Sequence, residues 1–251
     1  MALAGRVGRV LVVAAVLVAF WQGIVWAYDM PVFLLPGPGR VAEVLLAQAP
    51  SLAGDALITF GEVLAGFTLG TGLGATLALA MVARPALARA LMPVLLFSQA
   101  IPFFALAPIL VLWFGLGIGS KIAMAVIFIF FPVTSAFYDG LRRTDPALLD
   151  LAAVMGARPG RVLWHLRVPA AMPACASGLR LAAVYAPIGA VIGEWVGGAQ
   201  GGLGYQMLLA NGRSKIDLMF AALIVLALGV VAVYAAVDRL ARAMEAWAEG
   251  R

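Results

Sequence analysis

The sequence predicts an all-α, polytopic membrane protein with about six transmembrane helices. Two observations support this prediction. Of the 251 residues, 64% are hydrophobic and only 12% are charged, whereas soluble domains are about half apolar and about a quarter charged. The apolar residues also form runs of the length that a helix needs to cross a bilayer. We therefore expect one transmembrane domain over residues 1–251, with a core at 56–240 and a polar loop at 141–173.

The first apolar run, residues 10–27, follows a short basic segment. A secretory signal has the same charge pattern, but its apolar core is only about 7–15 residues long. Here the run is accompanied by Trp21, Trp26 and Tyr28, which suit a membrane–water interface. We therefore predict a first transmembrane helix. The six predicted spans cover residues 10–27, 56–83, 90–116, 122–138, 174–196 and 218–237.

The second span carries small residues at every fourth position, namely Gly66, Gly70, Gly74 and Ala78. Small residues at this spacing let two helix backbones approach closely in lipid, so we expect this face to pack on a neighbouring helix. Glu62 lies near the outer end of the same span. An acid within a span needs a partner or a cavity. We expect Glu62 to reach the outer interface, with contact to a substrate amine as the alternative.

Three prolines, Pro93, Pro102 and Pro108, interrupt the third span. Proline breaks the hydrogen-bond ladder of a helix, and the freed carbonyls need neighbouring helices or a water-filled cavity. We therefore expect a kinked helix that either lines a pathway or simply packs in the bundle. The candidate pathway residues are polar or aromatic side chains of the third and fifth spans: Ser98, Gln99, Phe103, Phe104, Tyr185 and Glu194.

The basic residues predict the orientation. With the N-terminus inside, the inner segments hold 13 of the 17 Lys and Arg residues and the outer segments hold 4. The positive-inside rule then places both termini and the polar loop in the cytoplasm. The expected outer segments are residues 29–55, with a short amphipathic helix at 40–48, a tight turn at 115–121 and a glycine-rich stretch at 197–217; the last inner segment is a charged tail at 238–251.

A helix–turn–helix is predicted within the polar loop, at residues 145–173. Asp145 suits the N-cap and Pro146 the first helical position. Gly156 can end the first helix in the left-handed conformation that favours glycine. Pro159 starts a second helix, and Pro169 ends it. The first helix carries an apolar stripe made of Leu148, Leu151, Ala152 and Met155. The second carries a basic strip made of Arg158, Arg161 and His165.

Aligned on Gly156, the loop has Asp150-Leu151-Ala152 before it and Leu166, Val168 and Pro169 after it. This spacing resembles the EAA motif of permease subunits in bacterial ATP-binding-cassette importers. That motif reads Glu-Ala-Ala, three residues, Gly, nine residues, Ile, one residue, Leu-Pro. The Gly and Pro stand where the family has them, whereas Asp replaces Glu and Leu replaces the first Ala.

The resemblance implies EAA-type coupling helices between spans four and five that dock on a separate ATPase subunit. It also implies a second permease chain in a homodimer, a periplasmic or lipid-anchored solute-binding protein, and the lipid of the bacterial inner membrane as surroundings. No nucleic acid, no cofactor and no catalytic residue is expected, because ATP would bind the partner subunit. The coupling residues so implied are Asp145, Leu148, Asp150, Leu151, Ala152, Met155, Gly156, Arg158 and Arg161.

Other classes of protein fit the sequence less well. One cysteine, Cys175, allows no intrachain disulfide, and one histidine, His165, allows no metal site built from a His pair. There is no GxxxxGK[ST] phosphate loop, and no nucleophile converges with a base as an intramembrane enzyme would require. A stand-alone secondary transporter is the alternative class. It predicts internal repeats and buried ionisable residues for ion coupling.

Two further resemblances bear on the substrate. The stretch 35–39, LPGPG, resembles the branch of the family that carries sulfonates, taurine and nitrate. The stretch 193–226, with GEWVG and ANGR, resembles permeases for pyrimidine precursors of thiamine. The spans contain no cation apart from Arg180, and their aromatic side chains suit a flat ring. We expect a hydroxymethylpyrimidine-type precursor, with an aliphatic sulfonate such as taurine, or nitrate, as the alternative.

Overall fold

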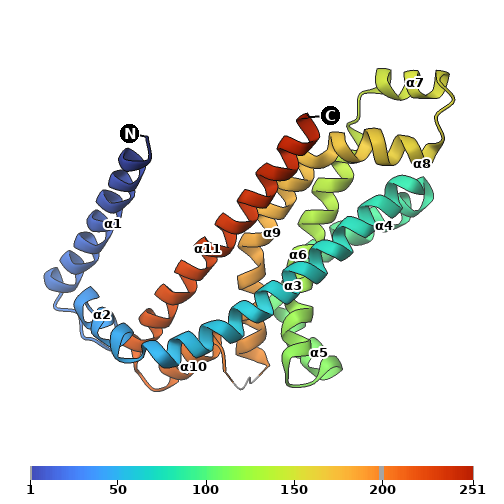
Figure 1. Ribbon diagram of the computed structural model, residues 1–251. Coiled ribbons are helices and arrows are strands. Elements are labelled where there is room, and N and C mark those ends of the chain that lie inside the picture. The colour runs from blue at the N-terminus through green and yellow to red at the C-terminus, as the bar shows by residue number, and fades with distance from the viewer. Residues whose placement is uncertain (1, 198–200, 251) are drawn as a thin grey trace.

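The computed structural model describes residues 2–197 and 201–250, and every regular element in that part of the chain is a helix (Figure 1). Residues 1, 198–200 and 251, which belong to the predicted N-terminal segment, outer stretch and charged tail, lie outside the described part. The helices are α1 (Ala2–Ala27), α2 (Pro38–Ala47), α3 (Ala49–Ala83), α4 (Pro85–Ala100), α5 (Phe103–Phe114), α6 (Ile118–Arg142), α7 (Pro146–Val154), α8 (Pro159–Val162), the π-helix η1 (Leu163–Arg167), α9 (Val168–Val196), α10 (Leu203–Gly212) and α11 (Ile216–Glu249).

Within the described residues, four helices are long and apolar enough to cross a membrane: α3, α6, the continuous helix Pro159–Val196, and α11 up to Ala248. The bent pair α4 and α5 passes the same test as one unit, and Val12–Ala27 within α1 forms a shorter apolar helix. These six pieces occupy the positions of the six predicted spans. The chain is therefore an all-α, multi-pass membrane protein.

The third predicted span is broken rather than kinked. Helices α4 and α5 meet at an angle of 104°. The break falls at Ile101 and Pro102, whereas Pro93 and Pro108 lie inside helices. The ring of a proline disfavours helical geometry in the residue before it, and Ile101 is extended, with φ −81° and ψ 125°. The break therefore follows from one of the three prolines.

The glycine stripe of α3 packs on α6, as predicted. A Cβ atom at Gly70 would lie 2.8 Å from Ile129 Cβ, and one at Gly66 would overlap Ala125. On the opposite side of α6, a Cβ at Gly189 of α9 would lie 2.6 Å from Ala125 Cα. Ala125 thus separates two backbones that only small residues can bring so close. Helices α3, α6 and α9 form the core of the bundle.

The predicted end of the second loop helix at Pro169 is wrong. Helix α8 continues through η1 into α9, so that one helix runs from Pro159 to Val196. The N–H of Val168 donates to the carbonyl of Leu163, five residues earlier, which is a π-type bond. This wider turn stands directly before Pro169, where the ring would otherwise clash with the preceding turn. The chain thus passes a proline without ending the helix.

Two other segments are more helical than predicted. The outer stretch 197–217 contains helix α10, and the tail at 238–251 continues α11 as far as Glu249. The tail is fastened by Arg180 of α9, whose Nε lies 2.8 Å from Asp238 Oδ1 and whose Nη1 lies 2.7 Å from Glu245 Oε1. These ion pairs lie on the α9-facing side of α11 and align the two helices beyond the predicted span.

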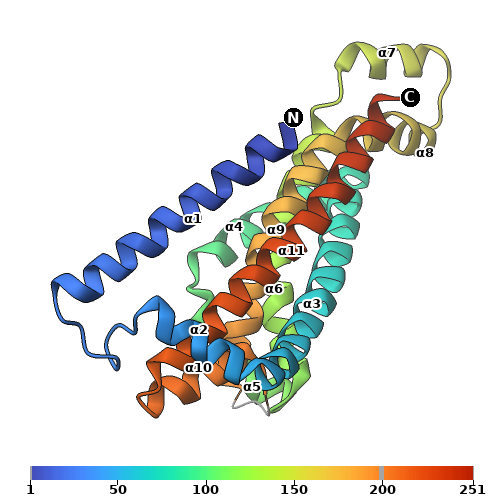
Figure 2. The same cartoon turned by 60° about the vertical axis from the view of Figure 1, so that its left-hand side comes forward.

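The two ends of the bundle carry different elements (Figures 1 and 2). Helices α2, α5 and α10 lie at one end, named here the α10 end. Helix α7 and the ends of the chain lie at the other, named the α7 end. Helix α1 stands apart from the bundle in both views. Trp21 of α1 stacks on Phe220 of α11, with ring centroids 5.5 Å apart.

Candidate functional site

Helix α7 begins and ends as its sequence predicts. The Asp145 carboxylate accepts a hydrogen bond of 2.9 Å from the N–H of Ala147, and Pro146 is the first helical residue. At the other end Gly156 takes φ +70°, and the N–H of Ala157 donates to the carbonyl of Ala152 at 2.9 Å. One unpaired N–H group at the start of α7 and one carbonyl group at its end therefore find partners within the loop.

The apolar side chains of α7 point to two sides. Ala152 is buried, with 7% of its surface exposed, while the other members of the predicted stripe stay exposed. Val154, which the stripe did not include, is the most exposed of all. Because these apolar side chains are uncovered at a protruding helix, they form a surface suited to a partner. The exposed fractions are 47% for Leu148, 56% for Leu151, 86% for Val154 and 77% for Met155.

The charged residues implied for the same loop are also exposed. Asp150 lies on α7, Arg158 precedes α8, and Arg161 lies on α8. His165 follows in η1 and its Nδ1 lies 3.1 Å from the carbonyl oxygen of Arg161, so its ring is oriented along the helix. Trp164 beside it is 57% exposed. The structure thus brings the predicted coupling residues together at one protruding end of the molecule (Figure 1).

The α10 end holds a buried polar network around Glu194. One carboxylate oxygen accepts the hydroxyl of Thr59 at 2.6 Å. The other accepts the N–H groups of Gly204 at 2.6 Å and Tyr205 at 3.2 Å. The network also includes Asp55 of α3, which accepts the N–H of Gly202 at 3.1 Å, while Thr59 accepts that of Leu203 at 2.8 Å.

These bonds satisfy the first N–H groups of α10, which have no partner within their own helix. Their acceptors come from α3 and α9, so three helices meet at one carboxylate. Gly202 and Gly204 admit the close contact, because a Cβ at Gly202 would overlap the Glu194 carboxylate. Glu194 was expected on a pathway. The structure places it fully buried, with both oxygens engaged.

Glu62 does not reach the outer interface, and that prediction is wrong. Its side chain is buried and forms an ion pair with Lys121, whose Nζ lies 2.6 Å from Glu62 Oε1. Lys121 was expected in a surface turn, but α6 already begins at Ile118, which turns the lysine into the bundle. A buried carboxylate needs such a partner to stay charged. The pair therefore links α3 to α6.

The remaining candidate pathway residues divide between two places. Ser98, Gln99, Phe103 and Phe104 gather at the bend between α4 and α5, whereas Tyr185 lies half-buried on α9. The Ser98 hydroxyl donates to the Leu95 carbonyl at 2.7 Å, and Gln99 Nε2 donates to Ser98 Oγ at 3.2 Å.

The two phenylalanines at this bend have different surroundings. Phe103 packs on Phe128 with ring centroids 4.7 Å apart, and Phe104 is exposed. Among the described residues, no group of three or more His, Cys, Asp or Glu side chains is placed to hold a metal ion.

Comparison with known proteins identifies a family. The family described as "Binding-protein-dependent transport system inner membrane component" matches residues 70–247. A "Probable ABC transporter permease protein" of Haemophilus influenzae is 46% identical over 94% of this chain and 96% of its own length. The "Formylaminopyrimidine transport permease protein ThiX" of Halalkalibacterium halodurans is 37% identical, over 86% of both chains. The "Riboflavin transport system permease protein RibX" of Chloroflexus aurantiacus is 34% identical, over 92% of this chain and 87% of its own.

Among solved structures, the fold is similar to a chain of the MetNI methionine ABC transporter in an inward-facing conformation. The TM-score is 0.61 and the sequence identity 22%, and the match covers 77% of this chain and 96% of the other. The likeness shows a shared fold.

Proposed function

The chain belongs to the family of binding-protein-dependent transport system inner membrane components, and we propose that α7 is the helix through which it couples to an ATPase. As a permease of an ATP-binding-cassette importer it is not itself an enzyme. The observation that carries the proposal is the exposed apolar side of α7, at a helix that protrudes from the α7 end. In this proposal the ATPase covers Leu148, Leu151, Val154 and Met155.

The coupling proposal is tested with charged substitutions on the exposed side of α7. Leu151→Glu and Val154→Glu should insert normally but should not retain the ATPase on purification, because each places a charge in an apolar contact. Leu240→Glu is the matched control, since Leu240 is 53% exposed at the same end on α11. If both α7 variants still retain the ATPase and support uptake, α7 is not the coupling helix.

Two substitutions suggested by sequence alone need separate interpretation. Ala152→Glu would place a charge in a side chain that this chain itself buries, so its loss of ATPase would report on packing as well as docking. Gly156→Leu would force a branched side chain into φ +70° and distort the end of α7. The exposed positions are therefore the sharper test.

We place the α7 end in the cytoplasm of a bacterial cell and the α10 end outside the inner membrane. Two permease chains would pair as a homodimer, with two ATPase subunits below and a periplasmic or lipid-anchored solute-binding protein above. Reporter fusions after Arg89 and Arg143 should be cytoplasmic, and those after Gln48 and Gly202 external. A reversed pattern would overturn this topology.

The transport step follows from these placements. ATP-driven closure of the ATPases would move α7, and the spans would tilt so that a cavity opens to the other side. This is alternating access by rigid-body motion. The bend between α4 and α5, with Ser98, Gln99, Phe103 and Phe104, is the proposed wall of the pathway. Glu194 is assigned instead to holding α10, because both of its oxygens are bonded.

For the substrate we propose a pyrimidine precursor of thiamine. The relative named for formylaminopyrimidine and the aromatic side chains of the α4–α5 bend support a flat, neutral or weakly basic ring. Calorimetry of the cognate binding protein should show tight binding of a hydroxymethylpyrimidine. Binding of taurine or an alkanesulfonate, with none of the pyrimidine, would overturn the choice, and binding of riboflavin alone would replace it with a larger ring. Uptake without any ATPase would instead indicate a stand-alone transporter.

A further inference from the structure

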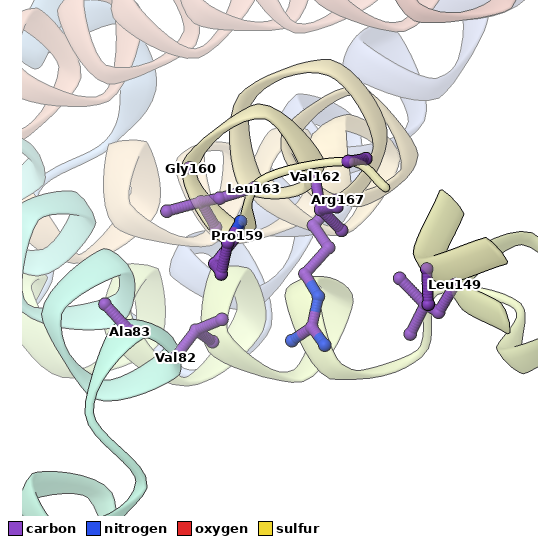
Figure 3. Close-up of a pocket in the computed structure, with 10 residues that line it drawn as sticks. Val82, Ala83, Leu149, Pro159, Gly160, Val162, Leu163 and Arg167 are labelled. Carbon is purple, nitrogen blue, oxygen red and sulfur yellow. The ribbon is translucent and has the colours of Figure 1, made fainter. Parts of the chain in front are cut away.

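Two neighbouring cavities lie at the α7 end of the bundle. Their volumes are about 410 and 430 Å³, and Val82 and Arg167 line both of them. The first cavity separates α7 from the bundle, with Leu149 on the α7 side and Val82, Pro159 and Leu163 opposite (Figure 3). The second continues along the start of α4 and the end of α6. Because Val82 and Arg167 line both, the two cavities adjoin, and together they are named the recess here.

Three arginines, Arg89, Arg142 and Arg167, line the second cavity. The Arg167 side chain extends into the first cavity between Val82 and Leu149 (Figure 3). Arg142 lies over the Tyr138 ring, with its guanidinium carbon 5.4 Å from the ring centroid. A guanidinium over an aromatic ring is attracted to the ring face, and this contact does not occupy its N–H groups.

None of the three arginines forms an ion pair with a carboxylate of the described residues. Elsewhere the chain does supply such partners: Arg40 pairs with Asp217, Lys121 with Glu62, and Arg180 with Asp238 and Glu245. Three arginines that line one cavity without a carboxylate partner favour an anion, and a phosphate accepts guanidinium N–H groups especially well.

The rest of the recess is largely apolar and lies near the ends of helices that are apolar enough to cross a membrane. Met81, Val82 and Met92 line it beside the arginines. Helix α3 ends at Ala83 and α4 begins at Pro85, so the recess lies where apolar helices end. A free anion would gain nothing from the methionines, whereas a lipid would place its phosphate among the arginines and its glycerol and first methylenes on the apolar side chains.

We propose that this recess binds the headgroup of an anionic phospholipid, with the phosphate held by Arg89, Arg142 and Arg167. The first cavity extends behind α7, so the bound lipid fills the space between α7 and the bundle. A lipid there supports α7 from its inner side, through Leu149 and Ala153. The site uses the inner side of α7 and does not depend on the outer side serving an ATPase.

The test is native mass spectrometry of the purified full-length chain with its co-purifying partners, in detergent with added phosphatidylglycerol. We expect Arg142→Gln to lower the affinity for the lipid about fivefold, which corresponds to about 1 kcal/mol, and Arg142→Gln/Arg167→Gln to lower it more than tenfold. Arg143→Gln is the matched control, because Arg143 is the exposed neighbour of Arg142 and does not line the recess. It should retain the lipid as the wild type does.

Two further arms identify the source of the phosphate. Phosphatidylcholine, which is zwitterionic, should bind at least tenfold more weakly, and inorganic phosphate at millimolar concentration should not displace phosphatidylglycerol. Full displacement by phosphate would replace the lipid with a soluble anion and overturn the proposal. Unchanged lipid retention in the double variant would overturn it too, and loss of the ATPase in that variant with lipid retained would assign the arginines to the protein partner.

Discussion

The two ends of the bundle differ in how deeply their charged side chains are buried. At the α10 end, Glu62, Lys121 and Glu194 are buried and joined to partners on other helices. At the α7 end, Arg89, Arg142 and Arg167 have no carboxylate partner among the described residues, and the apolar side of α7 is exposed. Buried charges that are bonded from one helix to another hold those helices together, whereas unpaired charges and an exposed apolar surface remain available to partners. The α10 end is thus held by buried polar contacts between helices, whereas the α7 end presents exposed groups to partners.

The largest expected effect comes from opening the buried ion pair at the α10 end. Lys121→Met leaves the Glu62 carboxylate buried without its cation, and this should lower the free energy of unfolding by about 3–5 kcal/mol. The measurement is unfolding of the detergent-solubilised protein. The double variant Lys121→Met/Glu62→Leu removes both charges and should recover most of the loss. A single variant as stable as the wild type would show that the pair does not hold the α10 end.

A somewhat smaller loss is expected at Glu194. Glu194→Ala removes the acceptor for the N–H groups of Gly204 and Tyr205 and for the Thr59 hydroxyl, and should cost about 3 kcal/mol. Hydrogen exchange at these two amides should become faster, because α10 loses its attachment to α9. Glu194→Gln keeps one acceptor oxygen and should lose less. Unchanged exchange in the alanine variant would contradict the role assigned to the carboxylate.

At the α7 end, breaking an ion pair should matter less. Arg180 pairs with Asp238 and Glu245, but these side chains are partly exposed to solvent. Arg180→Met should therefore lower the free energy of unfolding by only about 1 kcal/mol, and by less at high salt. Arg242→Met, in a more exposed pair with Asp238, serves as the control and should cost less still. A loss as large as that of Lys121→Met would remove the contrast between the ends.

The smallest effect on stability is expected on the exposed side of α7. Leu151→Glu should change the free energy of unfolding by less than about 0.5 kcal/mol, because the side chain contacts little within this chain. This variant should therefore lose the ATPase without losing stability. A loss above 1 kcal/mol in the isolated chain would show that α7 packs on the bundle.

Features set by neighbours along the chain were predictable. The cap at Asp145, the left-handed Gly156 and the glycine stripe of α3 were all predicted, and the structure confirms them. Each depends on backbone geometry or on helical spacing within a few residues. The break of the third span was also visible as prolines, although the sequence did not show which of Pro93, Pro102 and Pro108 would open the helix.

Features set by residues far apart were missed. Glu62 and Lys121 are 59 positions apart, and Thr59 and Glu194 are 135 apart. From the sequence, Glu62 was expected at the outer interface, Lys121 in an outer turn and Glu194 on a pathway. Residues 194–205, EWVGGAQGGLGY, do indicate the Glu194 contact. An acid followed by several glycines lets the backbone come close enough for its N–H groups to bind the carboxylate. Helix α10 was not predicted, because the acceptors for its first N–H groups lie on α3 and α9 and not next to it in the sequence.

The sequence by itself determined the membrane class, the positions of the spans, the family and the loop that carries α7. Hydrophobic runs and short motifs are local, and local patterns survive without knowledge of the fold. Only the tertiary structure decided where the charges go. It buried Glu62 and Glu194 against partners from other helices, and it gathered Arg89, Arg142 and Arg167 around one recess. The physical reason is that a charge takes its state from what lies beside it in space, and helix packing alone brings those neighbours together.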